Sequence, residues 1–170
     1  MLAAGAATRF GSPKQRVFLP MVLERLRRTS AAPIVVVTGA HELETDARTV
    51  PCPEWEHGPG ASLRCGLAAL PGEAEAAVVV LADGPELAPA AVERVVDVWR
   101  RSGAPVVAAS YGGERGHPVL LARDVWNSVP DEGARSLAAE LVPCDDLGAP
   151  GDVDTPAQAG GRVGVREGER

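Results

Sequence analysis

The sequence predicts an α/β protein with three layers, in which helices cover both faces of a mostly parallel sheet. Two observations carry this prediction. Short apolar runs rich in β-branched residues, at 33–38 and 76–82, are typical of strands buried on both faces. Segments with helical spacing lie between such runs, for example Val92, Val95 and Val96. Strands and helices that alternate in this way build an α/β/α sandwich.

Each element has its own signal in the chain. Leu19, Leu23 and Leu26 are spaced for a crossover helix, and Ala61 to Leu70 present a face of small and apolar side chains after a glycine-rich loop. A glycine loop over 111–117 leads into a later strand. The predicted strands are 33–38, 49–52, 76–82, 105–109 and one ending at 122, and the predicted helices lie near 19–28, 41–48, 61–70, 89–101 and 131–141.

Length and composition bound the function before any motif does. A chain of 170 residues suffices for one domain with a substantial core. We expect this single domain over 1–156 and a disordered tail over 157–170, whose start holds two glycines and no apolar face. A net charge of −6 and 4% aromatic residues argue against a nucleic-acid binder. The apolar runs are too short for a membrane span or a signal peptide, so we expect a cytoplasmic protein.

The cysteines and histidines form no recognisable metal-binding pattern. Cys52, Cys65 and Cys144 are odd in number and widely spaced, which predicts neither a zinc site nor a disulfide framework. The three histidines are scattered along the chain. We therefore expect reduced thiols and no structural metal.

The first fourteen residues have the composition of a phosphate-binding turn. The apolar start over 1–4 runs straight into Gly5, and small residues then lead to Arg9, Gly11 and Lys14. Free N–H groups in such a turn bind anions, and the two cations suit a polyphosphate. The glycine spacing fits neither the P-loop nor the dinucleotide fingerprint. The residues alone leave open a small-residue turn with two solvated cations.

Three further stretches place polar side chains where ligands bind. Ser62 follows a glycine-rich loop at a predicted helix start, which favours an anion or base-edge site, although a simple helix cap is the alternative. Asp83 ends the strand 76–82, at the sheet edge where α/β proteins bind ligands, and an ordinary turn residue is the alternative. Asp152 and Asp154 fall on the same side of an extended segment.

Together these motifs resemble the MobA-like nucleotidyltransferases, which include molybdenum cofactor cytidylyltransferases and, more distantly, sugar-1-phosphate nucleotidyltransferases. The resemblance covers about 1–156 and implies a Rossmann-like sheet of the nucleotide-diphospho-sugar transferase type, with one antiparallel strand late in the sheet. The matching signatures are L-A-A-G-x-x-x-R-x-G-x-x-K over 2–14, W-x-x-G-x-x-x-S-L-x-x-G-L over 55–67, L-x-D-x-P over 81–85, G-x-x-G-x-P-V-L over 113–120 and D-x-D-T-P over 152–156.

The resemblance implies that the chain moves an NMP from a nucleoside triphosphate to a phosphorylated acceptor and releases pyrophosphate. It implies Mg²⁺ held by Asp83 and Asp154, with Asp152 as the alternative ligand. Arg9 and Lys14 would hold the triphosphate and, with Asp83, form the catalytic set. The nucleotide contacts implied are Leu2, Ala3, Ala4, Gly5, Arg9, Lys14, Gly60 and Ser62, and the acceptor contacts are Gly116, His117 and Arg135.

Base and acceptor are implied less directly. Ala4 matches the L-A-A-G branch, which implies CTP as the nucleotide and molybdopterin as the acceptor. By position His117 could be a general base, and Arg135 could be a solvated cation instead of an acceptor contact. The short link after Lys14, and Gly84 where the family often has Gln, leave open an accessory protein that binds nucleotide without catalysis. A sugar-1-phosphate nucleotidyltransferase is the other alternative, and the oligomeric state stays open.

Overall fold

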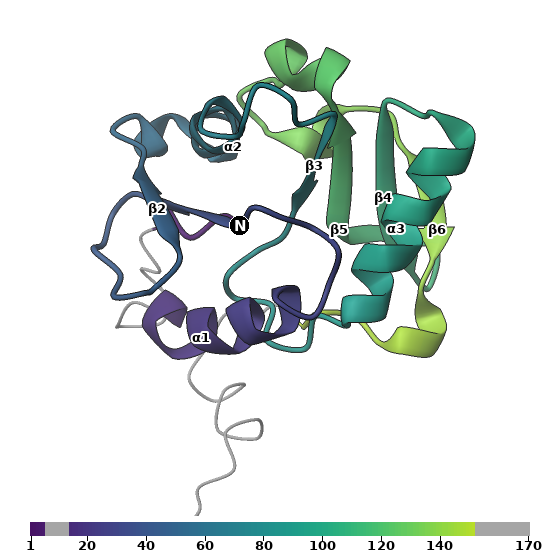
Figure 1. The fold of residues 1–170 in the computed structure, drawn as a ribbon, viewed down its shortest axis with the longest axis horizontal. Helices are drawn as coiled ribbons and strands as arrows, with labels where there is room; N and C mark the ends of the chain where they lie inside the picture. The colour runs from purple at the N-terminus through teal and green to yellow at the C-terminus, as the bar shows by residue number, and fades with distance from the viewer. Residues whose placement is uncertain (6–13, 152–170) are drawn as a thin grey trace, which may run out of the picture.

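The computed structural model describes residues 1–5 and 14–151 and confirms the predicted three-layer α/β fold. Helix α2 (Pro59–Ala68) covers one face of the sheet. Helices α1 (Lys14–Leu26) and α3 (Pro89–Ser102) cover the other face (Figure 1). α3 begins with a proline in its first turn and ends at Gly103, which has a left-handed φ of 65°.

Leu2 joins two separate ladders into one sheet. β1 (Val35–Thr38) pairs in parallel with β2 (Arg48–Pro51). Leu2 forms parallel bridges to Val37 on this side and to Leu81 on the other. The central position of the sheet is therefore occupied by a very short segment of the described chain.

The second ladder contains the antiparallel strand. β5 (Glu114–Ala122) runs antiparallel to both of its neighbours, β3 (Ala76–Val79) and β4 (Val106–Tyr111). β6 (Glu140–Pro143) runs parallel to β4. Gly112 and Gly113 form the tight turn between β4 and β5, with φ of 61° and 82° that side chains rarely adopt. The spatial order of the strands in this ladder is β3, β5, β4, β6.

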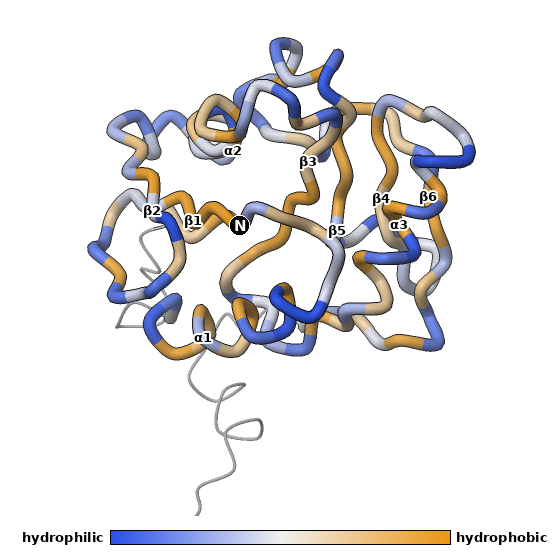
Figure 2. Tube along the Cα trace, viewed as in Figure 1, coloured by the Kyte–Doolittle hydropathy of each residue, from blue (hydrophilic) through white to orange (hydrophobic). Residues whose placement is uncertain are grey.

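Apolar side chains fill the space on both faces of the sheet. β1, β3 and β4 are mostly hydrophobic, whereas many of the surface loops are hydrophilic (Figure 2). Leu63 and Leu67 of α2 pack on one face of the β3–β6 ladder, and Val95 of α3 packs on the other. Burial on both faces explains why the strands read as continuous apolar runs. No helix within 1–5 and 14–151 has the length and apolar character needed to cross a bilayer.

Two predicted helices are wrong. The chain runs from His41 to β2 without a helix, and 131–141 contains only a three-residue 3₁₀ turn, η3 (Ala134–Ser136), before β6. The physical reason for the second error is a long-range contact. The guanidinium of Arg115 donates to the carbonyl oxygens of Ala134 (2.9 Å) and Leu137 (2.5 Å), which a helix would use internally.

The prediction of reduced thiols is also wrong for one pair. Cys52 follows β2 and Cys65 lies in α2, and the two are joined as a disulfide with a Cα–Cα distance of 5.8 Å. The sulfur of Cys52 also contacts the carbonyl oxygen of Ala61. The fold brings the end of β2 against the first turns of α2, which the spacing of the cysteines does not reveal. Cys144 is free and buried.

Candidate active site

A cavity of about 380 Å³ lies at the carboxyl edge of the central sheet. Its apolar wall comes from Leu2, Leu81 and the start of α2. Its polar wall comes from β5 and from the loop around η3. The structure thus brings together two of the three predicted acceptor residues, His117 and Arg135, and the remaining charged side chains of the wall are Arg115 and Glu132. Gly116, the third, lies beside His117 in β5.

His117 is a partly buried imidazole that is neutral at neutral pH. Burial lowers its pKa to about 4, and the nearby charge of Arg115 lowers it further, while the carboxylate of Asp83 acts in the opposite direction. The electrostatic contact with Asp83 places the predicted metal ligand close to the predicted acceptor residue. A neutral imidazole can accept or donate a hydrogen bond there without adding positive charge.

Arg115 holds the loop that carries Arg135. Its two hydrogen bonds to Ala134 and Leu137 fix this loop against β5. The guanidinium is partly buried, and desolvation lowers its pKa from the ordinary value. Because the Arg115 charge is already directed at backbone carbonyls, Arg135, which is exposed at the cavity, is the cation more accessible to an anionic ligand.

The turn after β3 presents Asp83 and receives the end of the described chain. The N–H of Glu86 donates to the carbonyl oxygen of Pro150 at 2.9 Å. A Cβ atom on Gly84 would lie 3.0 Å from Cβ of Pro150, so this glycine suits the close approach. The chain just before the predicted acidic pair therefore packs against the Asp83 turn. Asp152 and Asp154 themselves lie outside the described residues.

Asp83 is the predicted metal ligand that the described chain contains. Within 1–5 and 14–151, no three His, Cys, Asp or Glu side chains come together as a metal site. A single carboxylate at this edge would need further oxygen ligands from elsewhere, such as phosphate oxygens or the acidic pair that follows Gly151. The donor chemistry suits a hard divalent cation.

The segment 2–5 lies in the centre of the sheet, as the nucleotide-binding prediction requires. Ala3 and Ala4 are buried and Gly5 is exposed. The N–H of Ala40 donates to the carbonyl oxygen of Ala4 at 3.1 Å. A Cβ on Gly39 would lie 2.7 Å from that same oxygen, so no side chain fits there. Gly39 is a site residue that we did not predict, although a glycine directly after a buried strand was a signal for it.

Gln15 closes the base of the predicted phosphate turn. Its side-chain nitrogen donates to the carbonyl oxygen of Gly5 at 2.8 Å, and the side chain is 5% exposed. α1 begins at Lys14, so this contact joins the helix start to the end of the central segment. Nothing in the sequence singles out Gln15 for this role. Arg9 lies outside the described residues, and the structure does not describe the side chain of Lys14.

Gly60 and Ser62 both lie inside the start of α2. The N–H of Gly60 donates to the carbonyl oxygen of Asp131 at 2.9 Å, so this amide is engaged by the acceptor-side loop. Ser62 is 5% exposed and does not cap the helix, because α2 begins at Pro59 and its N-cap is Gly58.

A side-chain contact repeats this link between the two loops. Arg64 donates to the carbonyl oxygen of Val129 (2.9 Å) and to the carboxylate of Asp131 (2.8 Å). Together with the Gly60 contact, it fastens the acceptor-side loop to the first turns of α2. The predicted nucleotide and acceptor regions are thus physically connected.

Solved structures with the same fold come from several sources. The Rv0371c protein of Mycobacterium tuberculosis H37Rv is 27% identical, with a TM-score of 0.76 over 95% of this chain and 94% of that one. The same protein has been solved in complex with manganese, at 25% identity and a TM-score of 0.69 over 93% and 92%. Its homologue from Mycobacterium sp. strain JC1 is 24% identical, with a TM-score of 0.78 over 95% and 92%.

More distant structures share the fold alone. Molybdopterin-guanine dinucleotide biosynthesis protein A from Archaeoglobus fulgidus is 15% identical, with a TM-score of 0.64 over 92% of each chain. CMP:2-keto-3-deoxy-manno-octonic acid synthetase, solved with CTP, is 14% identical, with a TM-score of 0.67 over 95% of this chain and 93% of that one. Among curated proteins, no sequence match reaches significance.

The family model for the MobA-like NTP transferase domain matches residues 1–144. This range includes the Asp83 turn and also the central segment, β5 and the η3 loop, which contribute to the cavity described above. The match confirms the family inferred from the sequence signatures. The chain belongs to the MobA-like NTP transferase domain family.

Proposed function

We propose that this chain is a metal-dependent nucleotidyltransferase that transfers CMP from CTP to a phosphorylated acceptor of the molybdopterin class. The family membership supports the nucleotidyltransferase activity. The observation that carries the proposal is that His117 and Arg135 line one cavity beside the central segment, while Asp83 interacts electrostatically with His117. A carboxylate for a metal ion and a cation for an anionic ligand thus both lie near His117.

The nucleotide would lie along the central segment. Leu2, Ala3, Ala4 and Gly5 would contact the base and ribose, and the packing of Gly39 against Ala4 keeps this path narrow. The proposed triphosphate ligands are Arg9 and Lys14. Lys14 is the first residue of α1, and the Gly5–Gln15 contact joins this helix start to the end of the central segment. Gly60 and Ser62 would support the base from inside α2. The N–H of Gly60 is already bonded to the carbonyl oxygen of Asp131, and Ser62 is buried.

Magnesium is the metal that we propose, with Asp83 and Asp154 as its protein ligands and Asp152 as the alternative to Asp154. Nucleotidyltransferases of this family generally use divalent metals, and the manganese complex of a related structure fits that expectation. The packing of Pro150 on the Asp83 turn supports the pairing, because Pro150 precedes Asp152 by only two residues in the sequence. The bound metal would neutralise phosphate oxygens and the charge that develops during transfer.

The reaction needs no protein base at the acceptor. An oxygen of the acceptor phosphate attacks the α-phosphorus, and the bond from that phosphorus to the bridging oxygen of the β-phosphate breaks, so pyrophosphate leaves with the electron pair. The acceptor oxygen is already ionised at pH 7, so the neutral His117 serves for hydrogen bonding and shape. Arg135 would bind the acceptor phosphate. The work of the chain is chiefly positioning and charge neutralisation.

A cytoplasmic location belongs to the same proposal, because nucleoside triphosphates are substrates of that compartment.

Calorimetry with CTP, GTP and ATP, with and without Mg²⁺ or Mn²⁺, tests the proposal on one preparation. We expect metal-dependent binding with a preference for CTP. In Asp83→Ala the metal dependence should disappear, and turnover should fall by about 10²-fold or more, while the fold stays intact. Asp124→Ala, an exposed carboxylate on the opposite end of β5, is the matched control.

Each other outcome has a definite meaning. A preference for GTP or ATP would keep the nucleotidyltransferase and overturn the base assignment. Binding without turnover on any phosphorylated acceptor, sugar 1-phosphates included, would favour a nucleotide-binding accessory protein. Turnover that survives in Asp83→Ala would contradict the metal assignment.

A further inference from the structure

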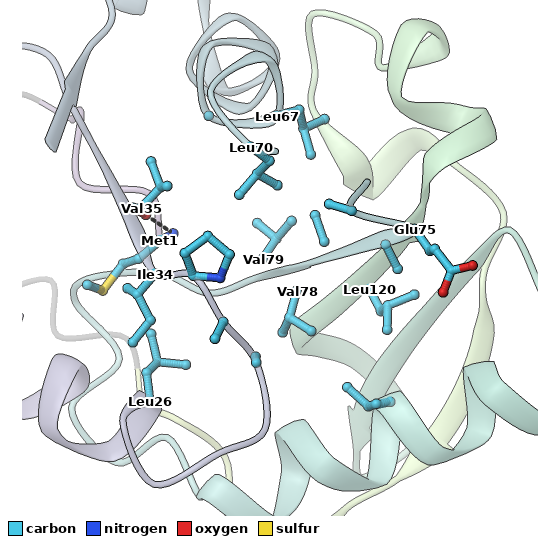
Figure 3. A pocket seen from close by; sticks show the side chains of 18 of the residues that line it. Met1, Leu26, Ile34, Val35, Leu67, Leu70, Glu75, Val78, Val79 and Leu120 are labelled. Atoms are coloured by element: carbon cyan, nitrogen blue, oxygen red, sulfur yellow. Dashed lines mark hydrogen bonds between the residues drawn. The ribbon is translucent and has the colours of Figure 1, made fainter. Parts of the chain in front are cut away.

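A second cavity, of about 340 Å³, lies at the amino edge of the same central position (Figure 3). Its wall is mostly apolar and includes Leu26, Ile34, Leu67, Leu70, Val78 and Leu120. The amino group of Met1 donates to the carbonyl oxygen of Val35 at 2.7 Å, and burial lowers the pKa of this amine to about 5. The charged side chains of the described wall are Glu75 and Arg100, and Arg100 forms an ion pair with Asp97 at 3.8 Å. In this cavity the guanidinium is therefore already paired.

The carboxyl-edge cavity, in contrast, is lined by an acid and a cation that are not paired. Glu132 and Arg135 both contribute to its wall, and both are exposed. Among the residues that the structure describes, neither side chain has a hydrogen-bond or ion-pair partner. The two residues are three positions apart, which is the spacing at which Asp97 and Arg100 meet on α3. A local feature of the chain must therefore separate Glu132 from Arg135.

Gly133 is the residue that separates the two charges. Its φ of 80° lies in the left-handed region that side chains rarely adopt, so the chain from Glu132 to Arg135 does not continue as one helical turn. The N–H of Gly133 donates to the carbonyl oxygen of Pro130 at 3.0 Å. This hydrogen bond closes a turn that has Asp131 and Glu132 at its two central positions. The turn leaves the carboxylate of Glu132 at the cavity without a partner from its own loop.

The backbone that carries Glu132 is anchored on both sides. Before it, the carboxylate of Asp131 accepts a hydrogen bond from Arg64 at 2.8 Å. After it, two hydrogen bonds from Arg115 hold the η3 loop. A ligand that binds to Glu132 therefore meets a loop that is already ordered, and does not have to order it on binding.

The charges of the cavity define the two ends of a ligand. Arg135 suits an anionic end, such as the phosphate of the proposed acceptor. A carboxylate only accepts hydrogen bonds, so Glu132 suits an end with N–H donors, and its two oxygens can accept from two adjacent N–H groups. The rest of the wall includes the apolar side chains of Leu2 and Leu81 and the neutral imidazole of His117. These surfaces suit an uncharged, flat ring.

We propose that Glu132 selects the acceptor by accepting hydrogen bonds from two adjacent N–H groups of a flat heterocycle, while Arg135 binds the acceptor phosphate. The amino group and the neighbouring ring N–H of a 2-amino-4-oxopyrimidine edge have this arrangement, which pterins and guanine share. The ring lies on the apolar wall of the cavity. This inference rests on the proposed transfer to a phosphorylated acceptor, and it names the residue that distinguishes one acceptor ring from another.

Two pairs of phosphorylated ligands test the proposal by calorimetry, with and without Mg²⁺ and the unreactive α,β-methylene analogue of CTP. The first pair is 6-hydroxymethylpterin phosphate and the matching lumazine phosphate, in which an oxygen replaces the 2-amino group. The second pair is GMP and IMP, which lacks that amino group. We expect the parent to bind the amino member of a pair about tenfold more tightly than the other member. Selectivity in the first pair identifies a pterin, and selectivity confined to the second pair identifies a purine.

Glu132→Gln separates recognition of the ring from a role in folding. The glutamine amide has one acceptor and one donor in place of two acceptors, so the preference for the amino ligand should fall to about twofold or less. The thermal midpoint should stay as in the parent, because the side chain has no partner in the described chain. Glu140→Gln, at an exposed carboxylate of β6 that does not line the cavity, is the matched control and should keep the full preference.

The outcomes distinguish this inference from the proposed function. Equal affinity of the parent for the amino and oxo ligands, a preference that survives in Glu132→Gln, or no binding of any of the four ligands would overturn the role of Glu132. Transfer of CMP to the pterin and lumazine phosphates with equal kcat/KM would keep the proposed function and overturn this inference. Selective binding of the pterin phosphate without transfer of CMP from CTP would keep the ring recognition and contradict the proposed function.

Discussion

The two cavities beside Leu2 have similar volumes, about 380 Å³ and 340 Å³, but their walls differ in kind. Leu2, Leu63 and Val79 contribute to both. At the carboxyl edge, loops add His117 and Arg135, and at the amino edge the walls are mostly apolar helices and strands. A cavity beside the central segment thus becomes a candidate active site at the edge where loops supply polar side chains.

Titration of His117, which lines only the carboxyl-edge cavity, should have the largest effect on the unfolding free energy. Its pKa is about 4 in the folded protein against 6.5 for the ordinary value, so only the unfolded chain takes up a proton between these pH values. The stabilisation is therefore present above pH 6.5 and is lost as the pH falls toward 4, by at most about 3 kcal/mol. Urea unfolding of the parent and His117→Gln at several pH values, with a chelator present, measures it.

The difference between these two curves isolates His117, because the Met1 amine contributes equally to both proteins. His117→Gln should depend less on pH than the parent between pH 6.5 and 4. Parallel curves would contradict the neutral state of this partly buried imidazole.

Gly60→Ala should break the polar wall of the carboxyl-edge cavity. The new Cβ would lie 2.0 Å from the carbonyl oxygen of Pro130 and 2.8 Å from Cα of Asp131, so the backbone of one loop must move. We expect a loss of about 2 to 3 kcal/mol in unfolding free energy. Gly72→Ala is the control, since its Cβ would meet no atom within 4 Å, and its stability should change by less than about 0.5 kcal/mol. Equal losses in the two variants would contradict the packing argument.

Arg115→Met should loosen the same wall from the other side. The substitution keeps an unbranched aliphatic stem but removes the donors to Ala134 and Leu137, so we expect a loss of about 1.5 kcal/mol. Chemical denaturation measures this loss. Arg28→Met, at an exposed position after α1, should leave the unfolding free energy nearly unchanged. A variant at Arg115 as stable as the parent would mean that solvent replaces the two contacts without cost.

Two matched alanine-to-leucine substitutions should have the smallest effect on stability and compare the two cavities most directly. Ala74→Leu adds apolar volume toward the amino-edge cavity and should stabilise the protein by about 1 kcal/mol. Ala134→Leu adds the same volume toward the carboxyl-edge cavity, where it should not stabilise but should weaken acceptor binding. Thermal unfolding and acceptor titrations check the pair. Stabilisation by both would mean that the two cavities are alike.

The sequence predicted the elements whose signal is local. The helix predicted over 89–101 is observed as Pro89–Ser102, and the strand predicted over 33–38 is observed as Val35–Thr38, because apolar periodicity directly reflects burial in these elements. The helix predicted over 131–141 failed because Arg115, distant in sequence, competes for its carbonyl groups. No pattern within that segment records such a contact.

The candidate site was predictable to a similar degree. Asp83 follows β3 and His117 lies in the first half of β5. The predicted strand ends were therefore enough to place both residues at one edge of the sheet. Gln15 and Arg115 act on backbone carbonyls of remote segments, and neither has a motif of its own. The Cys52–Cys65 contact likewise depends on how β2 meets α2, which only the folded chain reveals.

The short central segment at Leu2, which joins the two ladders, has a mechanical consequence. In the described chain the central segment is tied to the β3 side by two backbone hydrogen bonds, from Leu2 to Val80 and from Ala82 to Leu2. Under a stretching force applied across the sheet, few other backbone hydrogen bonds share the load with these two. The sheet should therefore separate between the central segment and β3 before either ladder opens. Because Leu2 contributes to both cavities, that single rupture would open the walls of both together.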